Sequence, residues 1–166
     1  MTELEFVSYF EDVAIMLKDI CHDPTNHIIR FARMEEVLNK IRSELEFVPG
    51  MVIKNEAGSI QGLGKGNLTE MHRCSFMILQ QCANDDYTVY QQAFHETFVI
   101  GRKVLAKMTK DKIECVGIML NLDLNSITWQ KIGPVYDNCY GYEFHFSLTE
   151  KAGCAYTYNE NDWKTP

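Results

Sequence analysis

Polar and apolar residues alternate strictly near the C-terminal end of the chain, in the second half of the segment from Ile127 to Leu148. Apolar and aromatic side chains occupy every second position and polar residues or glycine the positions between: Tyr142, Phe144, Phe146 and Leu148 against Gly141, Glu143, His145 and Ser147. A period of two is typical of a β-strand that is covered on one face. With turn residues at Asp137-Asn138-Cys139, the segment predicts a β-hairpin.

A second pattern, with helical spacing, runs from about Asp86 to Lys110. Its apolar positions recur every three or four residues: Tyr87, Tyr90, Phe94, Phe98, Gly101, Leu105 and Met108. That spacing predicts a long helix with one apolar face. We expect this face to cover the hairpin, with Phe144 and Phe146 buried beneath Phe94 and Phe98.

The rest of the chain shows shorter elements. The pattern predicts two helices, from Thr2 to about Ile20, within an N-terminal helical segment 1–22, and from Met34 to Leu45. It indicates strands at Phe47–Lys54 and Thr69–Cys82, and favours a strand over a buried connection at Ile113–Leu120. It leaves His27–Arg33 open between strand and helix. Paired strands interrupted by helices predict an α+β fold, a single domain over 1–166 with a largely antiparallel or mixed sheet.

Glycines gather in the segment 56–68, which contains EAGSIQGLGKGN and shows no periodicity. We interpret it as a mobile loop between two strands. A phosphate-binding loop of the Walker type would need glycine at Ser59 and Ser or Thr at Gly66, so GLGKG does not meet that motif. The last residues, 150–166, are predicted to form a polar tail.

Composition and charge limit the functional classes. The formal net charge is −7 over 166 residues, which disfavours direct nucleic-acid binding because phosphate contacts need clustered Lys and Arg. Apolar runs such as Val116–Leu120 are too short to cross a membrane. Six scattered cysteines in a chain of this length indicate a reduced, cytoplasmic protein rather than a disulfide framework.

Cysteines and histidines also raise the question of a metal. Cys21, His22 and His27 lie within seven residues, with His72 and Cys74 as the nearest supplement. No fourth ligand follows at a suitable spacing, so we expect no metal ion and no other cofactor.

Two histidines lie beside carboxylates, His95 next to Glu96 and His145 near Glu143. Such pairs are suited to general acid–base catalysis, but neither is accompanied by a nucleophile in a recognisable context. We therefore expect no catalytic residue and a non-enzymatic protein. Two alternatives stay open, a small enzyme using His95 or His145, and a ligand-binding module.

Aromatic residues and glycines supply candidate contact surfaces. Tyr and Trp are favoured at interfaces because they combine apolar area with a hydrogen-bonding group. The candidate interface residues are Gly62, Gly64, Gly66, Trp129, Tyr136, Tyr140, Tyr142 and Trp163. If the protein is instead a ligand-binding module, we expect the aromatic surface around Tyr140 and Tyr142 to close over the ligand.

The order of these elements resembles a known group. A glycine-rich segment between strands, a long helix, the closing hairpin SITWQKIGPVYDNCYGYEFHFSL and a tail with Trp163 are similar to small virion proteins of tailed phages, of the tail-terminator and neck-completion type. The likeness spans about Ile28 to Trp163, and the segment before Phe31 departs from it. It implies a ring-like homo-oligomer that binds a tail-tube or neck protein, cytoplasmic before assembly and then part of a phage or prophage virion.

Overall fold

The fold is known from a computed structural model, which describes residues 1–25, 29–39, 48–62, 68–82, 87–136 and 138–152. Its elements in chain order are α1 (Glu3–Met16), β1 (Phe31–Arg33), α2 (Met34–Asn39), β2 (Gly50–Gly62), β3 (Leu68–Gln81), α3 (Tyr87–Ile113), the 3-10 helix η1 (Gly117–Asn121), β4 (Leu122–Val135) and β5 (Cys139–Lys151). The strands form one sheet in the order β1-β2-β3-β5-β4. Only β1 and β2 are parallel, so the expected α+β domain with a mixed sheet is confirmed.

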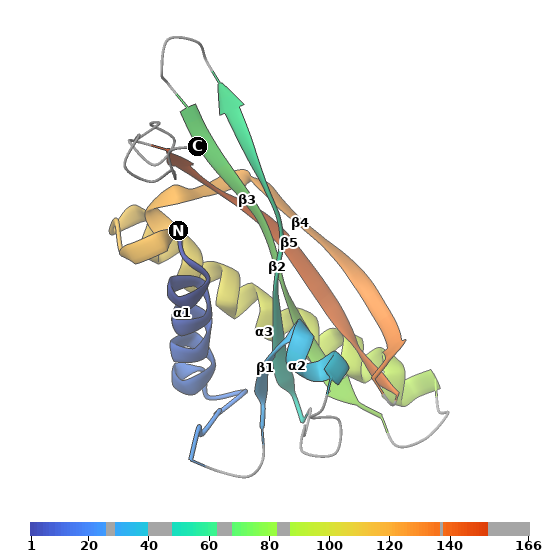
Figure 1. Cartoon of the computed structure of the whole chain (residues 1–166). Coiled ribbons are helices and arrows are strands. Elements are labelled where there is room, and N and C mark those ends of the chain that lie inside the picture. The colour runs from blue at the N-terminus through green and yellow to red at the C-terminus, as the bar shows by residue number, and fades with distance from the viewer. Residues whose placement is uncertain (26–28, 40–47, 63–67, 83–86, 137, 153–166) are drawn as a thin grey trace, which may run out of the picture.

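Helices α1 and α3 lie on the same face of the sheet (Figure 1) and enclose the main core. Phe6 and Phe10 of α1 pack on Phe146, while Phe98 of α3 stacks on Phe144 with ring centroids 6.2 Å apart. The expected burial of Phe144 beneath Phe98 is therefore confirmed, but Phe146 lies under α1. Two residues along a strand advance about 6.6 Å, so the successive apolar positions of β5 meet different helices.

Among the described residues, the opposite face of the sheet is covered at one end alone. There, a smaller cluster of buried residues lies between α2 and the sheet: Ala32, Val37, Val52, Met77, Leu79 and Cys139. The rest of this face carries the polar positions of the alternating strands, including Glu143 and His145. It is the surface on which the candidate site lies.

Part of the glycine-rich segment 56–68, which was expected to be a loop, is β-strand. Residues 56–62 continue strand β2 and pair with β3, for example Gly58 with His72 and Gly62 with Leu68. The prediction of a loop from residue 56 is wrong. The glycines give this segment a low local preference for strand, but hydrogen bonds to β3 hold it in the extended conformation. Residues 63–67, with Gly64 and Gly66, lie outside the described residues.

Two other boundaries differ from the sequence pattern. Helix α1 ends at Met16 rather than near Ile20. Ile20 is still buried, but it belongs to a turn after the helix, in which its N–H donates to the Leu17 carbonyl. The strand favoured at Ile113–Leu120 is also wrong, because α3 reaches Ile113 and η1 follows. Met119 of η1 is buried in the core, and Gly117 has a φ of +49°, which lies outside the β region.

Other assignments are confirmed as far as the structure describes them. Strand β3 and helix α3 match their predicted ranges closely, and the open segment before Arg33 contains the short strand β1. The second predicted helix corresponds to α2, and residues 40–47 lie outside the described part. The predicted tail begins later than residue 150, since β5 runs to Lys151, and 153–166 are not described.

A buried carboxylate joins α1 to α3. Asp111 is 2% exposed, accepts a hydrogen bond of 2.8 Å from the Tyr9 hydroxyl and one of 2.6 Å from Lys107 Nζ. Burial raises the pKa of Asp111, but the bonds from Lys107 and Tyr9 outweigh it and hold the pKa below its usual 3.8. The folded state therefore favours the charged carboxylate.

We expect Asp111→Asn to lower the free energy of unfolding by about 1.5–3 kcal/mol at neutral pH, because a charged acceptor is lost. Since the folded pKa is depressed, this stabilisation is present above the unfolded pKa and disappears as pH falls through the folded value. The difference between wild type and variant should shrink below about pH 4 in urea titrations. Asp19→Asn, which removes the exposed pair with Lys103, is the control and should cost less than about 1 kcal/mol. Equal effects of the two changes would contradict a stabilising role for the buried Asp111 carboxylate.

Candidate functional site

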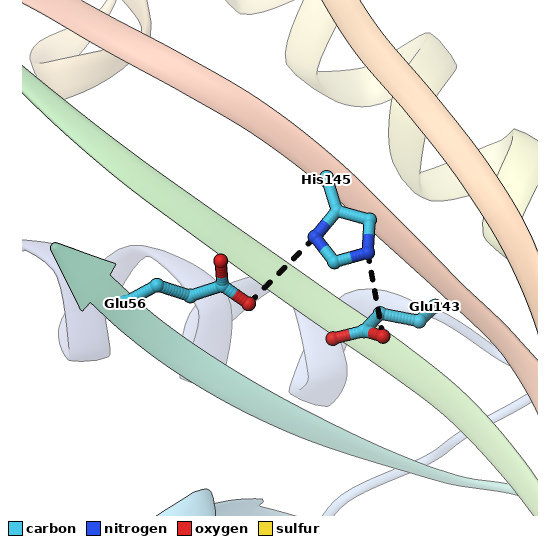
Figure 2. Close-up of side chains that lie close together, drawn as sticks. All are labelled: Glu56, Glu143 and His145. Carbon is cyan, nitrogen blue, oxygen red and sulfur yellow. Dashed lines mark ion pairs between the residues drawn. The ribbon is translucent and has the colours of Figure 1, made fainter.

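A cluster of polar side chains occupies the open face of the sheet, where three neighbouring strands meet. Ser75 of β3 pairs directly with His145 of β5, and Glu143 lies two residues before His145 on the same face. Glu56 reaches the cluster from β2, at the bulge between Asn55 and Ala57. A bulge changes the direction of a side chain relative to regular alternation, and here it directs Glu56 toward His145 (Figure 2).

His145 lies between two carboxylates, as Figure 2 shows. Its Nδ1 is 3.7 Å from Glu56 Oε1, and its Nε2 is 3.3 Å from Glu143 Oε2. Hydrogen bonds from neighbouring side chains fix both carboxylates. Gln130 Nε2 donates to Glu143 Oε2 at 2.9 Å, and Ser75 Oγ lies 3.1 Å from Glu143 and 3.3 Å from Glu56.

An imidazole placed between two carboxylates is a combination of groups used in general acid–base catalysis. The His145 side chain is 31% exposed, so a molecule on this face can reach it. Ser75 is fully buried, and its hydroxyl has carboxylates as its hydrogen-bond partners rather than the imidazole. The cluster therefore lacks the geometry of a Ser–His nucleophile.

The two candidate histidines do not form one site. His95 lies on α3, on the other side of the sheet from His145. Together with Phe94, Phe98, Lys131 and Tyr142, His95 lines a surface hollow of about 360 Å³.

The residues weighed for a zinc site are also apart. His22 is buried after α1 and packs on the Phe31 ring at 5.8 Å, and burial lowers its pKa. Cys74 lies in the core of the sheet, where its Sγ is 3.8 Å from Asn55. His27 lies outside the described residues, so the group is not assembled within the part of the chain that the structure describes.

Most of the candidate interface aromatics are partly used inside the protein. Tyr140 stacks on Tyr90 at 4.2 Å, and Tyr142 packs against Phe98 at 4.9 Å. The Tyr136 hydroxyl donates to Met34 Sδ. Trp129 on β4 is 54% exposed and offers the largest aromatic surface of the described set. Gly62 is the last residue of β2, and Trp163 lies outside the described residues.

Sequence reasoning found Glu143 and His145 through their alternation but missed Glu56 and Ser75. Ser75 carried a usable signal, since it is a polar residue between the buried positions Cys74 and Phe76. Glu56 carried none, because a bulge is not visible in the residue pattern.

No protein-family model, curated protein or solved structure matches this chain. Among the described residues, no helix is long and apolar enough to cross a membrane.

Proposed function

We propose that this protein is a non-enzymatic structural subunit of a tailed phage or prophage, of the tail-terminator or neck-completion type. It acts by binding copies of itself in a ring and by binding a tail-tube or neck protein. The proposal starts from the resemblance in element order and is supported by the shape of one part of the sheet.

The supporting observation is the outer end of the β2–β3 hairpin. Residues 56–62 of β2 are exposed, including the apolar Ile60 at 53%, and this end of the hairpin projects beyond the helices (Figure 1). Strand β2 pairs here with β3, which pairs in turn with β5, so the extension is an ordered part of the sheet that presents Ile60 to a neighbour. Such an extension is suited to contact with a neighbouring subunit.

The edge strand β4 provides a second contact surface. It is fourteen residues long, forms the end of the sheet and exposes Leu124 and Trp129. An edge strand offers backbone groups to another chain, and its exposed tryptophan supplies apolar area. Subunits in a closed ring use two different surfaces, and the hairpin and β4 lie on different parts of the sheet.

Assembly with the tail-tube protein of the same phage or prophage, which the proposal requires, is the test. Electron microscopy should show rings or capped tubes for the wild-type mixture, and Ile60→Asp should abolish them because a charge enters the contact. Val48→Asp, at an apolar position of similar exposure (52%) just before the opposite end of β2, is the matched control and should assemble normally. A mixture without rings or caps, with virions of normal length after deletion of the gene, would contradict the proposal.

A second candidate is a small enzyme using His145, which the two flanking carboxylates favour. It predicts turnover of a substrate that binds the open sheet face, and loss of that turnover in His145→Gln with the fold retained. The solution mass separates the two candidates in the presence of a tail-tube partner, since an enzyme has no need to assemble on it.

A further inference from the structure

A second group of titratable residues lies at the far end of the sheet from α2, on the face that α1 covers. Glu70 and His72 point to the same face of β3, and Glu70 pairs directly with Glu150 of β5. His72 is buried, with 11% of its side chain exposed. Backbone pairing therefore holds one buried imidazole and two carboxylates together.

The imidazole has an unused nitrogen. His72 Nε2 has no hydrogen-bond partner among the described residues, although it lies 3.2 Å from Glu70 Oε1 and 3.5 Å from Glu150 Oε1. These distances are short, but the angles make no hydrogen bond. A buried polar atom without a partner is costly, so native structures seldom leave one.

We propose that Glu70, His72 and Glu150 bind one divalent metal ion, Zn²⁺ by preference, through His72 Nε2 and one oxygen of each carboxylate. The three ligand atoms lie within 4.8 Å of one another. Zinc bonds of about 2.0–2.1 Å in a tetrahedron place ligand atoms about 3.3–3.4 Å apart. The observed 3.2 and 3.5 Å match that spacing, and water takes the fourth position.

The surroundings allow the ion to enter. Glu150 also lines a surface pocket of about 620 Å³, together with Tyr9 and Asn121, so one carboxylate faces solvent. The α-amino group of Met1 contacts Glu150 Oε1. This oxygen is also the one 3.5 Å from His72 Nε2, so zinc must displace the amine from Oε1 or the Glu150 carboxylate must turn to present its second oxygen.

The cluster around His145 has the same residue types and provides a comparison. There, Gln130 Nε2 is 3.4 Å from His145 Nε2, and Glu143 accepts hydrogen bonds from Gln130 and Ser75. Its ligand atoms are thus already engaged. Two similar groups in one chain, one with a free buried nitrogen and one without, make the proposal sharply testable.

This inference departs from the expectation of no metal, which was argued from Cys21, His22 and His27 with His72 and Cys74 as the nearest supplement, and did not consider Glu70 or Glu150. It is also independent of the phage proposal. A metal here links β3 to the C-terminal end of β5, where the N–H of the following residue Ala152 donates to the Leu68 carbonyl. The folded protein should gain stability from zinc, because the unfolded chain does not hold these ligands together.

Calorimetric titration of chelator-treated full-length protein with zinc chloride is the test. We expect one ion per chain, with a melting temperature that rises with zinc concentration. Loss of an outer-shell partner alone costs metal affinity about 10–100-fold, so His72→Gln should weaken binding by more than about 100-fold. Glu70→Gln should weaken it as well, and His145→Gln should leave it unchanged.

A spectroscopic readout keeps the test valid if His72→Gln fails to fold. In wild-type protein, long-range ¹H–¹⁵N spectra of the imidazoles should show zinc moving the Nε2 resonance of His72 and leaving those of His145 in place. Absence of zinc binding by the wild type, or a zinc-dependent shift at another histidine with none at His72, would overturn the proposal. So would a folded His72→Gln variant with undiminished affinity.

Discussion

Replacing Phe146 with alanine should lower the free energy of unfolding by about 3–5 kcal/mol, which is the usual range for a fully buried phenylalanine. The ring is 2% exposed and lies between α1 and the sheet. Its centroid is 5.8 Å from that of Phe10, 6.3 Å from that of Phe76 and 6.5 Å from that of Phe6. Truncation leaves a cavity that these three rings cannot fill without moving α1. Urea titration followed by circular dichroism measures the loss.

Trp129→Ala is the control for this prediction. The indole packs on Phe98 with centroids 6.0 Å apart but is 54% exposed, so its removal opens no enclosed cavity. We expect a loss of about 1 kcal/mol or less. An unchanged melting temperature for Phe146→Ala would show that the packing of α1 on β5 is wrong.

Replacing Gly141 with alanine should have a similarly large effect, about 3 kcal/mol or more, because the added methyl group meets backbone. A Cβ built on Gly141 lies 1.9 Å from the Ile78 carbonyl oxygen and 3.2 Å from the Leu79 Cα. Both atoms belong to the central strand β3, which is held by neighbours on both sides. The strand cannot yield without losing its pairing with β5, and glycine in a strand often marks such a close approach.

Gly58→Ala is the matched glycine control. Its added Cβ would meet only His72 Nδ1, at an ordinary contact distance of 3.9 Å. We expect a change within about 0.5 kcal/mol. If urea titration gives the same stability for both glycine variants, the close approach of β5 to Ile78 is not present in the protein.

Much of the candidate site followed from local periodicity. The alternation after Tyr140 placed Glu143 and His145 together on the polar face, because successive residues of a strand point to opposite faces. It also placed Phe144 toward the helices. The partners from other strands did not follow. Glu56 joins His145 through a bulge in β2, and Glu150 meets Glu70 only because β3 and β5 are neighbours in the sheet.

The sequence by itself determined the element types wherever one periodicity ran for three turns or more, as in α3, or alternated over a whole strand, as in β5. Such patterns are local, since each residue's face depends only on its spacing from its neighbours. Tertiary structure alone decided the rest. The glycine-rich residues 56–62 are strand because β3 lies beside them, and Ile113–Leu120 is not strand because no neighbouring strand pairs with it within the described part of the chain. Strand formation needs hydrogen bonds from a second segment, and the spacing of residues within one segment does not record which segment that is.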